Sequence, residues 1–200
     1  MDLRRLVFLD EAGAKTNMTR VFARARRGQR AIDYAPQGHW NTTTLVAAIT
    51  QESALAPMLL DGPMDVLAFE AYIEHVLVPA LPEHAIVVMD NLSPHKAPAV
   101  AKLLHAAGAD LWYLPPYSPD FNPIEQMWAK IKSALRRAKA RTQEQLCRAI
   151  ATALAQITPS DTKGFFDHSV VGIISYTPLV SLVGQVHPSS IISLKPSTNP

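Results

Sequence analysis

Residues 86–96 read Ile-Val-Val-Met-Asp-Asn-Leu-Ser-Pro-His-Lys, an unbroken apolar run that stops directly on a carboxylate, Asp90. Four consecutive apolar residues without alternation indicate a strand that is covered on both faces, as in the parallel part of an α/β sheet. Ligands bind beyond the carboxyl ends of such strands, which is where Asp90 would lie. Asn91, Ser93 and Pro94 are also typical of a turn or a helix cap, so a purely structural role explains Asp90 equally well.

A second short apolar run, residues 5–10, repeats this design and ends on Asp10. Residues 11–13, Glu-Ala-Gly, are predicted to turn the chain away from the strand. If the two strands are neighbours, Asp10 and Asp90 lie at one edge of the sheet. Like charges so close need a counter-charge, and a divalent cation is the usual one. The alternative is that Asp10 or Glu11 caps a turn and pairs with a nearby arginine.

The other periodic segments predict an α/β fold with the order three strands, helix, strand, helix, strand, helix. A hairpin is expected from the β-branched residues before Thr50 and the apolar run that closes at Gly62. The remaining elements are a helix capped by Asp65 and ending at Pro79, a helix from Pro94 to Gly108, a strand over residues 110–114, a helix from Asn122 through Leu135, and an amphipathic helix over residues 141–157.

Residues 115–125, Pro-Pro-Tyr-Ser-Pro-Asp-Phe-Asn-Pro-Ile-Glu, form a proline-rich connection that excludes helix and central strand before Asn122. Asn122 is predicted to cap the next helix, with Pro123 as its first residue and Glu125 as its third. This arrangement fits a capping box, in which Glu125 needs no metal. The stiff loop favours a second interpretation, in which the helix dipole keeps a fixed Glu125 ionised as a metal ligand.

The net charge of +2 hides an uneven distribution of basic residues. Eight of the 19 Lys and Arg residues lie in residues 1–30 and seven in residues 130–148, whereas these two stretches hold only four of the 17 acidic residues. Such segregation suits a phosphate backbone, and the common alternative is a pair of solvated faces. The segment from Arg20 to Arg30 is predicted to be an exposed arm.

The length of 200 residues, with 48% hydrophobic and 18% charged residues, predicts one domain with one core. No stretch reaches the about 20 consecutive apolar residues of a membrane span, and no signal peptide precedes the first strand, so we expect an intracellular protein. The single cysteine, Cys147, excludes an internal disulfide and gives no metal-ligand cluster. The motifs of dinucleotide-binding proteins, serine hydrolases and zinc proteases are absent.

Three segments resemble the signature blocks of DDE-superfamily transposases: Phe-Leu-Asp-Glu-Ala-Gly at 8–13, Val-Met-Asp-Asn-Leu-Ser-Pro-His at 88–95, and Leu-Pro-Pro-Tyr-Ser-Pro-Asp-Phe-Asn-Pro-Ile-Glu at 114–125. They are most similar to the blocks of the bacterial insertion-sequence group related to the mariner elements. Between Asp90 and Glu125 lie 34 residues, which is the spacing of that group.

This resemblance implies a ribonuclease H-like fold, in which three antiparallel and two parallel strands form a mixed sheet flanked by helices. It makes Asp10, Asp90 and Glu125 the acidic triad that binds two Mg²⁺ ions, which Mn²⁺ can replace. The implied activity is cleavage of double-stranded DNA at the ends of the element and joining of the freed end to a target. Further candidates, for orienting a ligand or contacting DNA, are Asn91, His95, Asn122, Arg24, Arg26, Arg27, Lys130, Arg136 and Arg137. For the first three of these, capping or turn formation is an equally good explanation.

The resemblance extends from about Leu6 to about His168, so residues 1–168 are predicted to be the catalytic domain and residues 169–200 a poorly ordered tail. Full-length family members begin with a helix-turn-helix region that reads the element ends. We expect that part to act here in cis or in trans, with a homodimer as a further possibility. The implied location is the cytoplasm, associated with the nucleoid and without membrane contact.

Two alternatives remain open at this point. The first is a catalytically silent, truncated transposase fragment that binds nucleic acid or a partner subunit. The second is another ribonuclease H-like nuclease, for example a junction resolvase, which does not account for the proline-rich block.

Overall fold

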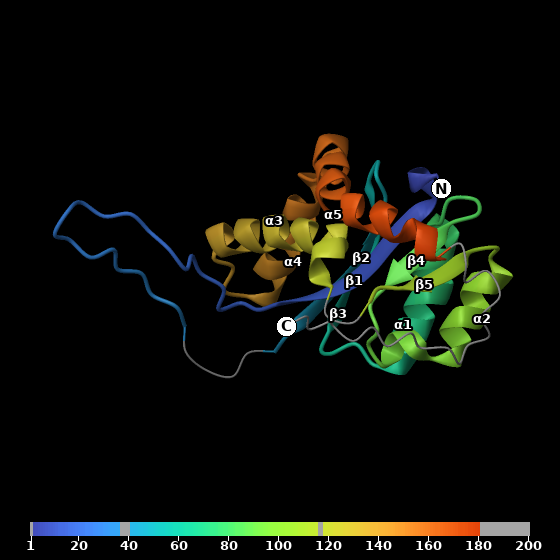
Figure 1. Cartoon of the computed structure of the whole chain (residues 1–200). Coiled ribbons are helices and arrows are strands. Elements are labelled where there is room, and N and C mark those ends of the chain that lie inside the picture. Colours follow the sequence, from blue (N-terminus) through green and yellow to red (C-terminus); the bar gives the residue numbers. More distant parts are fainter. Residues whose placement is uncertain (1, 37–40, 116–117, 181–200) are drawn as a thin grey trace, which may run out of the picture.

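A five-stranded sheet forms the centre of the computed structural model, which describes residues 2–36, 41–115 and 118–180 (Figure 1). The strand order is β3-β2-β1-β4-β5; the first three strands are antiparallel, and β4 and β5 run parallel to β1. This arrangement confirms the predicted mixed sheet of three antiparallel and two parallel strands. The strands are β1 (Leu6–Ala14), β2 (Thr43–Ile49), β3 (Ala54–Asp61), β4 (Ile86–Met89) and β5 (Asp110–Tyr113).

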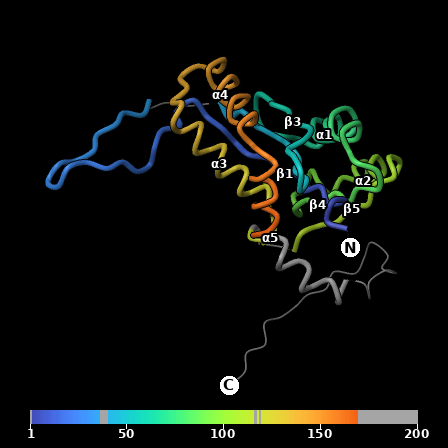
Figure 2. Tube along the Cα trace, turned by 90° about the horizontal axis from the view of Figure 1, so that it is seen from above, coloured from blue at the N-terminus to red at the C-terminus, as the bar shows by residue number. Residues whose placement is uncertain are grey.

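Helices cover both faces of the sheet (Figure 2). Leu6 and Phe8 of β1 belong to the apolar core under α3, α4 and α5, whereas Val7 and Leu9 belong to the core under α1 and α2. Because successive strand residues point to opposite faces, a strand covered on both sides must be apolar at every position. The helices are α1 (Val66–Tyr72), α2 (Pro98–Ala106), α3 (Pro123–Ala138), α4 (Gln143–Ala155) and α5 (Pro159–Val180).

Several helix ends follow from local side-chain chemistry. Asp65 caps α1 as predicted, because its Oδ1 accepts the Ala68 N–H at 2.8 Å. A reciprocal capping box starts α5: Asp161 Oδ2 accepts the Thr158 N–H at 2.9 Å, and Thr158 Oγ1 accepts the Asp161 N–H at 3.2 Å. The helix expected from Pro94 begins as a 3₁₀ turn, and α2 itself starts at Pro98, which has no N–H to continue an earlier helix.

The first strand is longer than predicted. It does not end at Asp10 but continues to Ala14, so Glu11 and Gly13 lie within the strand rather than in a turn. The reason is the antiparallel partner: β2 pairs with β1 from Phe8↔Ile49 through Ala14↔Thr43, which satisfies the backbone groups of this extension.

A long arm, defined as residues 15–36, leaves the body of the protein between β1 and β2 (Figure 1). Arg141 anchors the first residues of the arm, because its Nη1 donates to the Thr16 carbonyl at 2.8 Å and to the Met18 carbonyl at 3.0 Å. Lys139, just after α3, holds the returning half through an ion pair with Asp33 at 2.6 Å. The predicted exposed basic arm is therefore present, and both of its ends are anchored near the end of α3.

The predicted boundary at His168 does not coincide with the end of an element. Helix α5 continues to Val180, and Ser169 is buried and accepts a hydrogen bond from Gln126 Nε2 at 3.1 Å. Residues 181–200, which belong to the predicted tail, lie outside the described part of the chain. No helix in the described part is long and apolar enough to cross a membrane.

Candidate active site

Asp10 and Asp90 each follow the segment in which β1 and β4 pair. The register between these parallel strands ends at Phe8 and Val88, so each aspartate comes two residues further along, Asp10 within β1 and Asp90 directly after β4. Asp10 is only 8% exposed, and its Oδ2 accepts the indole N–H of Trp128 in α3 at 3.2 Å. The central strand pair thus brings together the two aspartates that the sequence placed at strand ends.

Asp10 is electrostatically coupled to the other carboxylates of this edge. Burial and the negative charges of Glu125, Asp90 and Glu11 together raise the pKa of Asp10 to about 7, against a hydrogen bond from the Glu11 backbone. Three other carboxylates therefore act on Asp10. Such a group of charges is stabilised by protons or by cations.

Asp90 directly follows β4, and its side chain is fixed by two contacts. Its Oδ1 accepts the Leu92 N–H at 3.0 Å and lies 2.6 Å from Nδ1 of His95. Burial opposes ionisation, but the hydrogen bonds from His95 and from the Leu92 backbone lower the pKa of Asp90 below its usual value. The next residue, Asn91, donates from Nδ2 to the Leu114 carbonyl and so joins the ends of β4 and β5.

His95 lies between two carboxylates. Its Nε2 is 3.2 Å from Oε1 of Glu11, while Nδ1 faces Asp90. The contact of Nδ1 with Asp90 is a close ion pair, and Nδ1 makes no well-aligned hydrogen bond in the described part of the chain. Burial works against protonation, but Asp90 and Glu11 outweigh it and raise the pKa of His95 to about 9. The two carboxylates thus favour the protonated form of His95, which also lies in the 3₁₀ turn Pro94–Lys96.

Glu125 lies in the first turn of α3, as predicted, and its side chain is exposed. Asn122 lies at the predicted cap position, but the prediction that its side chain caps the helix is wrong. The Glu125 N–H donates instead to the backbone carbonyl of Asn122 at 3.1 Å. Asn122 is 4% exposed, and its Oδ1 has no hydrogen-bond partner in the described part of the chain. Both residues line a depression of about 300 Å³, which Asp120, Gln126 and His168 also border.

The donor atoms at this edge fit a hard divalent cation. Carboxylate and amide oxygens are the ligands that Mg²⁺ prefers, and Asp10, Asp90, Glu125 and the unpaired Oδ1 of Asn122 supply them. A cation would also relieve the mutual repulsion at Asp10. In the described residues, however, no three Asp, Glu, His or Cys side chains are already arranged closely enough to hold an ion. Binding would therefore require the side chains to turn toward a common centre.

The basic residues singled out from the sequence differ in their exposure and in their partners. Arg24, Arg26 and Arg27 are exposed on the arm, and Arg137 lines a depression of about 910 Å³ between the arm and the end of α3. Lys130 is already engaged within the protein, because its Nζ pairs with Asp161 of α5 at 2.5 Å. That pairing and the Thr158 hydrogen bonds lower the pKa of Asp161 to about 2. Arg136, the remaining candidate, is half-buried in the last turn of α3.

Two further residues belong to the site and are not among the candidates from the sequence. Glu11 lies within β1 rather than in the expected turn, and the strand alternation that directs Asp10 to α3 places Glu11 on the opposite face, beside His95. Trp128 lies in α3, and no local pattern indicates that its N–H reaches Asp10. A tryptophan one turn after Glu125 is the only available signal, because a buried indole N–H needs an acceptor.

Comparisons with known proteins identify the family of this chain. Residues 5–147 match the family described as DDE superfamily endonuclease. The Tcb1 transposable-element transposase of Caenorhabditis briggsae is 27% identical over 123 residues, which cover 56% of this chain and 45% of that protein. This chain therefore spans about half the length of that curated relative.

Solved structures of the Mos1 transposase share the fold. A pre-cleavage Mos1 transpososome superposes with a TM-score of 0.71 at 19% identity, over 92% of this chain and 57% of the Mos1 chain. The Mos1 catalytic domain with raltegravir and Mg gives a TM-score of 0.65 at 18% identity, over 93% of this chain and 87% of that domain. The likeness thus extends over most of that domain but only about half of the longer Mos1 chain. Since the family match covers well over half of its residues, this chain belongs to the DDE superfamily endonucleases and has the ribonuclease H-like fold of the Mos1 catalytic domain.

Proposed function

We propose that this chain is the catalytic part of a transposase that cleaves DNA strands at the ends of an insertion sequence and joins them to a target. The observation that carries the proposal is that Asp10 and Asp90 follow the paired segment of two neighbouring parallel strands at equal distance along the chain, with the charges of Asp90 and Glu125 acting on Asp10. The 34-residue spacing between Asp90 and Glu125 supports the bacterial insertion-sequence group related to mariner elements. The location follows as cytoplasmic and nucleoid-associated.

In this proposal Asp10, Asp90 and Glu125 bind two Mg²⁺ ions, for which Mn²⁺ can substitute. Two ions at one phosphodiester activate the attacking hydroxyl or water and stabilise the leaving oxygen. Mos1 structures with Mg and with Mn support this choice of metal. The protein's own contribution is to fix Asp10 through the Trp128 indole, to fix Asp90 through His95 and Leu92, and to hold Glu125 at the start of a helix.

The partner in this proposal is double-stranded DNA at the ends of the element. Mos1 was solved in a paired-end complex with the left transposon end, which supports double-stranded element ends as the substrate here. A helix-turn-helix part, in cis or in trans, would supply the base readout. A homodimer would bring two element ends together.

A second candidate is a catalytically silent fragment that binds nucleic acid or a partner subunit. The specific observation in its favour is that the carboxylates are not prearranged for a metal in the described part of the chain. The two candidates differ in one assay: nicking of a terminal-repeat duplex by the full chain, with the recognition part added in trans, in Mg²⁺ and in EDTA. Mg²⁺-dependent nicking is the result expected for the enzyme. DNA binding without nicking under all these conditions would favour the silent fragment.

Binding to DNA by this chain alone is expected to depend steeply on salt and weakly on sequence, because the arm offers arginines to phosphates. Each phosphate contact contributes about 0.9 to the slope of log K against log salt concentration. Replacing Arg24, Arg26 and Arg27 together by alanine should therefore lower the slope by up to about 3. The measurement is fluorescence anisotropy of a labelled duplex at several salt concentrations.

The matched control is Lys102→Ala, which removes an exposed cation from α2, a helix on the opposite face of the sheet from α3. Its slope should equal that of the parent. An unchanged slope in the arm variant, or strong preference of the parent for a terminal repeat over random duplex, would contradict this role of the arm.

A further inference from the structure

The two consecutive carboxylates of β1 face opposite sides of the sheet and have different partners. Asp10 points to α3, where the Trp128 indole donates to it, and Glu11 points to the side of α1 and α2. There Glu11 Oε1 lies 3.2 Å from Nε2 of His95, a residue 84 positions away in the sequence. The proposed triad does not use Glu11, so its position needs a separate explanation.

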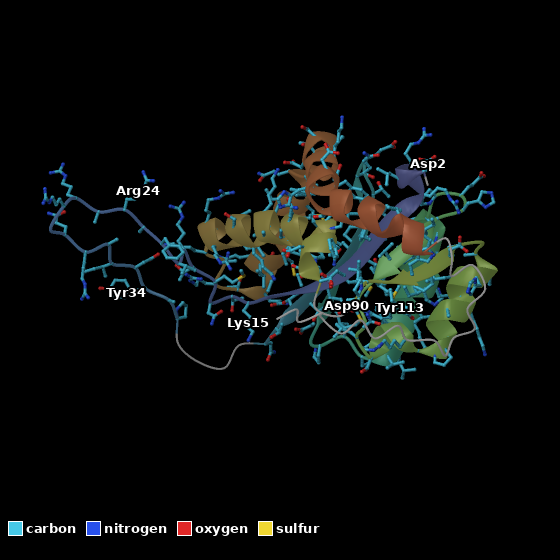
Figure 3. All side chains as sticks on the ribbon, viewed as in Figure 1. Asp2, Lys15, Arg24, Tyr34, Asp90 and Tyr113 are labelled. Carbon is cyan, nitrogen blue, oxygen red and sulfur yellow. The ribbon has the colours of Figure 1, made fainter. Side chains whose placement is uncertain are left out.

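His95 is held rigidly in the protein interior. Its side chain is fully buried, and its ring packs against Phe69 of α1 with 4.5 Å between the ring centroids. The backbone carbonyl of His95 accepts the Tyr113 hydroxyl at 2.9 Å, which ties the segment after β4 to the end of β5 beside Asp90 (Figure 3). A ring that is fixed by packing and by its backbone can direct a neighbouring side chain.

In the part of the chain that the structure describes, both contacts of the Asp90 carboxylate fall on the same oxygen. The Leu92 N–H and Nδ1 of His95 both lie within hydrogen-bonding distance of Oδ1, at 3.0 Å and 2.6 Å. Asp90 itself is outside β4, in a segment without regular structure, so these two contacts set the orientation of its carboxylate. Oδ2 then remains as the oxygen available to a metal ion.

We propose that Glu11 and His95 are positioning residues for Asp90. Glu11 orients the His95 ring through Nε2, and the ring holds Oδ1 of Asp90 through Nδ1, so that Oδ2 is presented to the cation. The inference rests on the proposed function, in which Asp90 is a metal ligand. Partners of a ligand that lie outside the first coordination sphere typically contribute about 10- to 100-fold to metal affinity.

An alternative role for Glu11 is direct coordination of a cation. Its side chain is 15% exposed and lines an open depression of about 760 Å³ together with Asp61 and Gly62. The two roles differ in whether the effect of Glu11 on metal binding depends on His95 and Asp90. A positioning residue acts only through His95 and Asp90, whereas a direct ligand contributes independently of them.

The experiment is a Mn²⁺ titration of the full chain, in which electron paramagnetic resonance measures the free ion and so gives Kd without any DNA reaction. Glu11→Gln and His95→Gln are each expected to raise Kd by about 10-fold or more, and the double variant should be no weaker than His95→Gln alone. Glu83→Gln and His105→Gln, which change exposed residues of the same types, should leave Kd unchanged. Circular dichroism checks that each variant is folded at the titration temperature.

Because His95 is buried, a second background keeps the test decisive if His95→Gln does not fold. In an Asp90→Asn chain, adding Glu11→Gln should not weaken Mn²⁺ binding further. The inference is overturned if Glu11→Gln binds Mn²⁺ with the same Kd as Glu83→Gln. It is also overturned if Glu11→Gln raises Kd by the same factor in the His95→Gln or the Asp90→Asn background as in the parent chain. If Asp90→Asn itself leaves Kd at the parent value, the proposed function fails as well, and this outcome is distinct from the other two.

Discussion

Replacing Glu125 by glutamine is expected to lower Mg²⁺-dependent strand cleavage by about a hundredfold or more, because the metal supplies several kcal/mol to the transition state. A neutral amide is a poor ligand for a hard dication and leaves the site one negative charge short. Stability should change by no more than about 1 kcal/mol, since the exposed side chain loses only its interaction with the helix dipole. Nicking of a terminal-repeat duplex, with the recognition part in trans, and thermal unfolding measure the two effects.

Glu144→Gln is the matched control, because Glu144 is also an exposed glutamate in the first turn of a helix, α4. Its only described partner is Arg148, in an ion pair on the helix surface. This variant should cleave like the parent. Equal cleavage by Glu125→Gln and Glu144→Gln would show that Glu125 serves the helix alone and would remove it from the triad.

Replacing Phe166 by alanine should destabilise the protein by about 3 to 5 kcal/mol, because the change leaves a cavity in the core. Phe166 is 1% exposed and meets Phe8 of β1 edge to face, with 5.4 Å between the ring centroids. It packs α5 against the central strand of the sheet, and Thr162 of the same helix donates to the carbonyl of Gln51, in the turn between β2 and β3, at 2.9 Å. Urea unfolding is the measurement, with an unchanged m-value expected.

Phe22→Ala makes the same chemical change at a side chain that is 90% exposed on the arm. It should alter the free energy of unfolding by less than about 0.5 kcal/mol. If Phe166→Ala lowered the free energy of unfolding as little as Phe22→Ala, α5 would not be part of the folded core. The assignment of Phe166 to the apolar core under α3, α4 and α5 would then be wrong.

Local sequence patterns predicted the structure correctly wherever interactions between residues close in the sequence, or burial alone, determine it. The apolar run before Asp90 predicted a strand buried on both faces, and β4 is such a strand because its residues alternate between two cores. Asp65 was predicted to cap a helix, and it does so with an N–H only three residues away. In both cases the deciding interactions are short-range or follow from burial alone.

The errors arose where a distant segment competes for the same backbone or side chain. Residues 11–13 look like a turn, yet pairing with β2 extends the strand through them. Asn122 is the exception, because its error has a local cause: its own backbone carbonyl accepts the Glu125 N–H, and its Oδ1 has no partner in the described part of the chain. The role of Lys130 in DNA contact stays a prediction, but its ion pair with Asp161 of α5 is a tertiary contact that local sequence patterns do not indicate.

The sequence by itself determined the order of the elements as far as α4, the strand that contains Asp10, the strand that ends before Asp90, and the helix that begins beside Glu125, because apolar periodicity and turn residues act over a few positions. Helix α5 was not predicted. Only the tertiary structure decided which partner each polar side chain finds. Trp128 reaches Asp10 across 118 positions, and His95 reaches Glu11 across 84. Contacts of this kind depend on how strands and helices pack, and a pattern of neighbouring residues does not encode them.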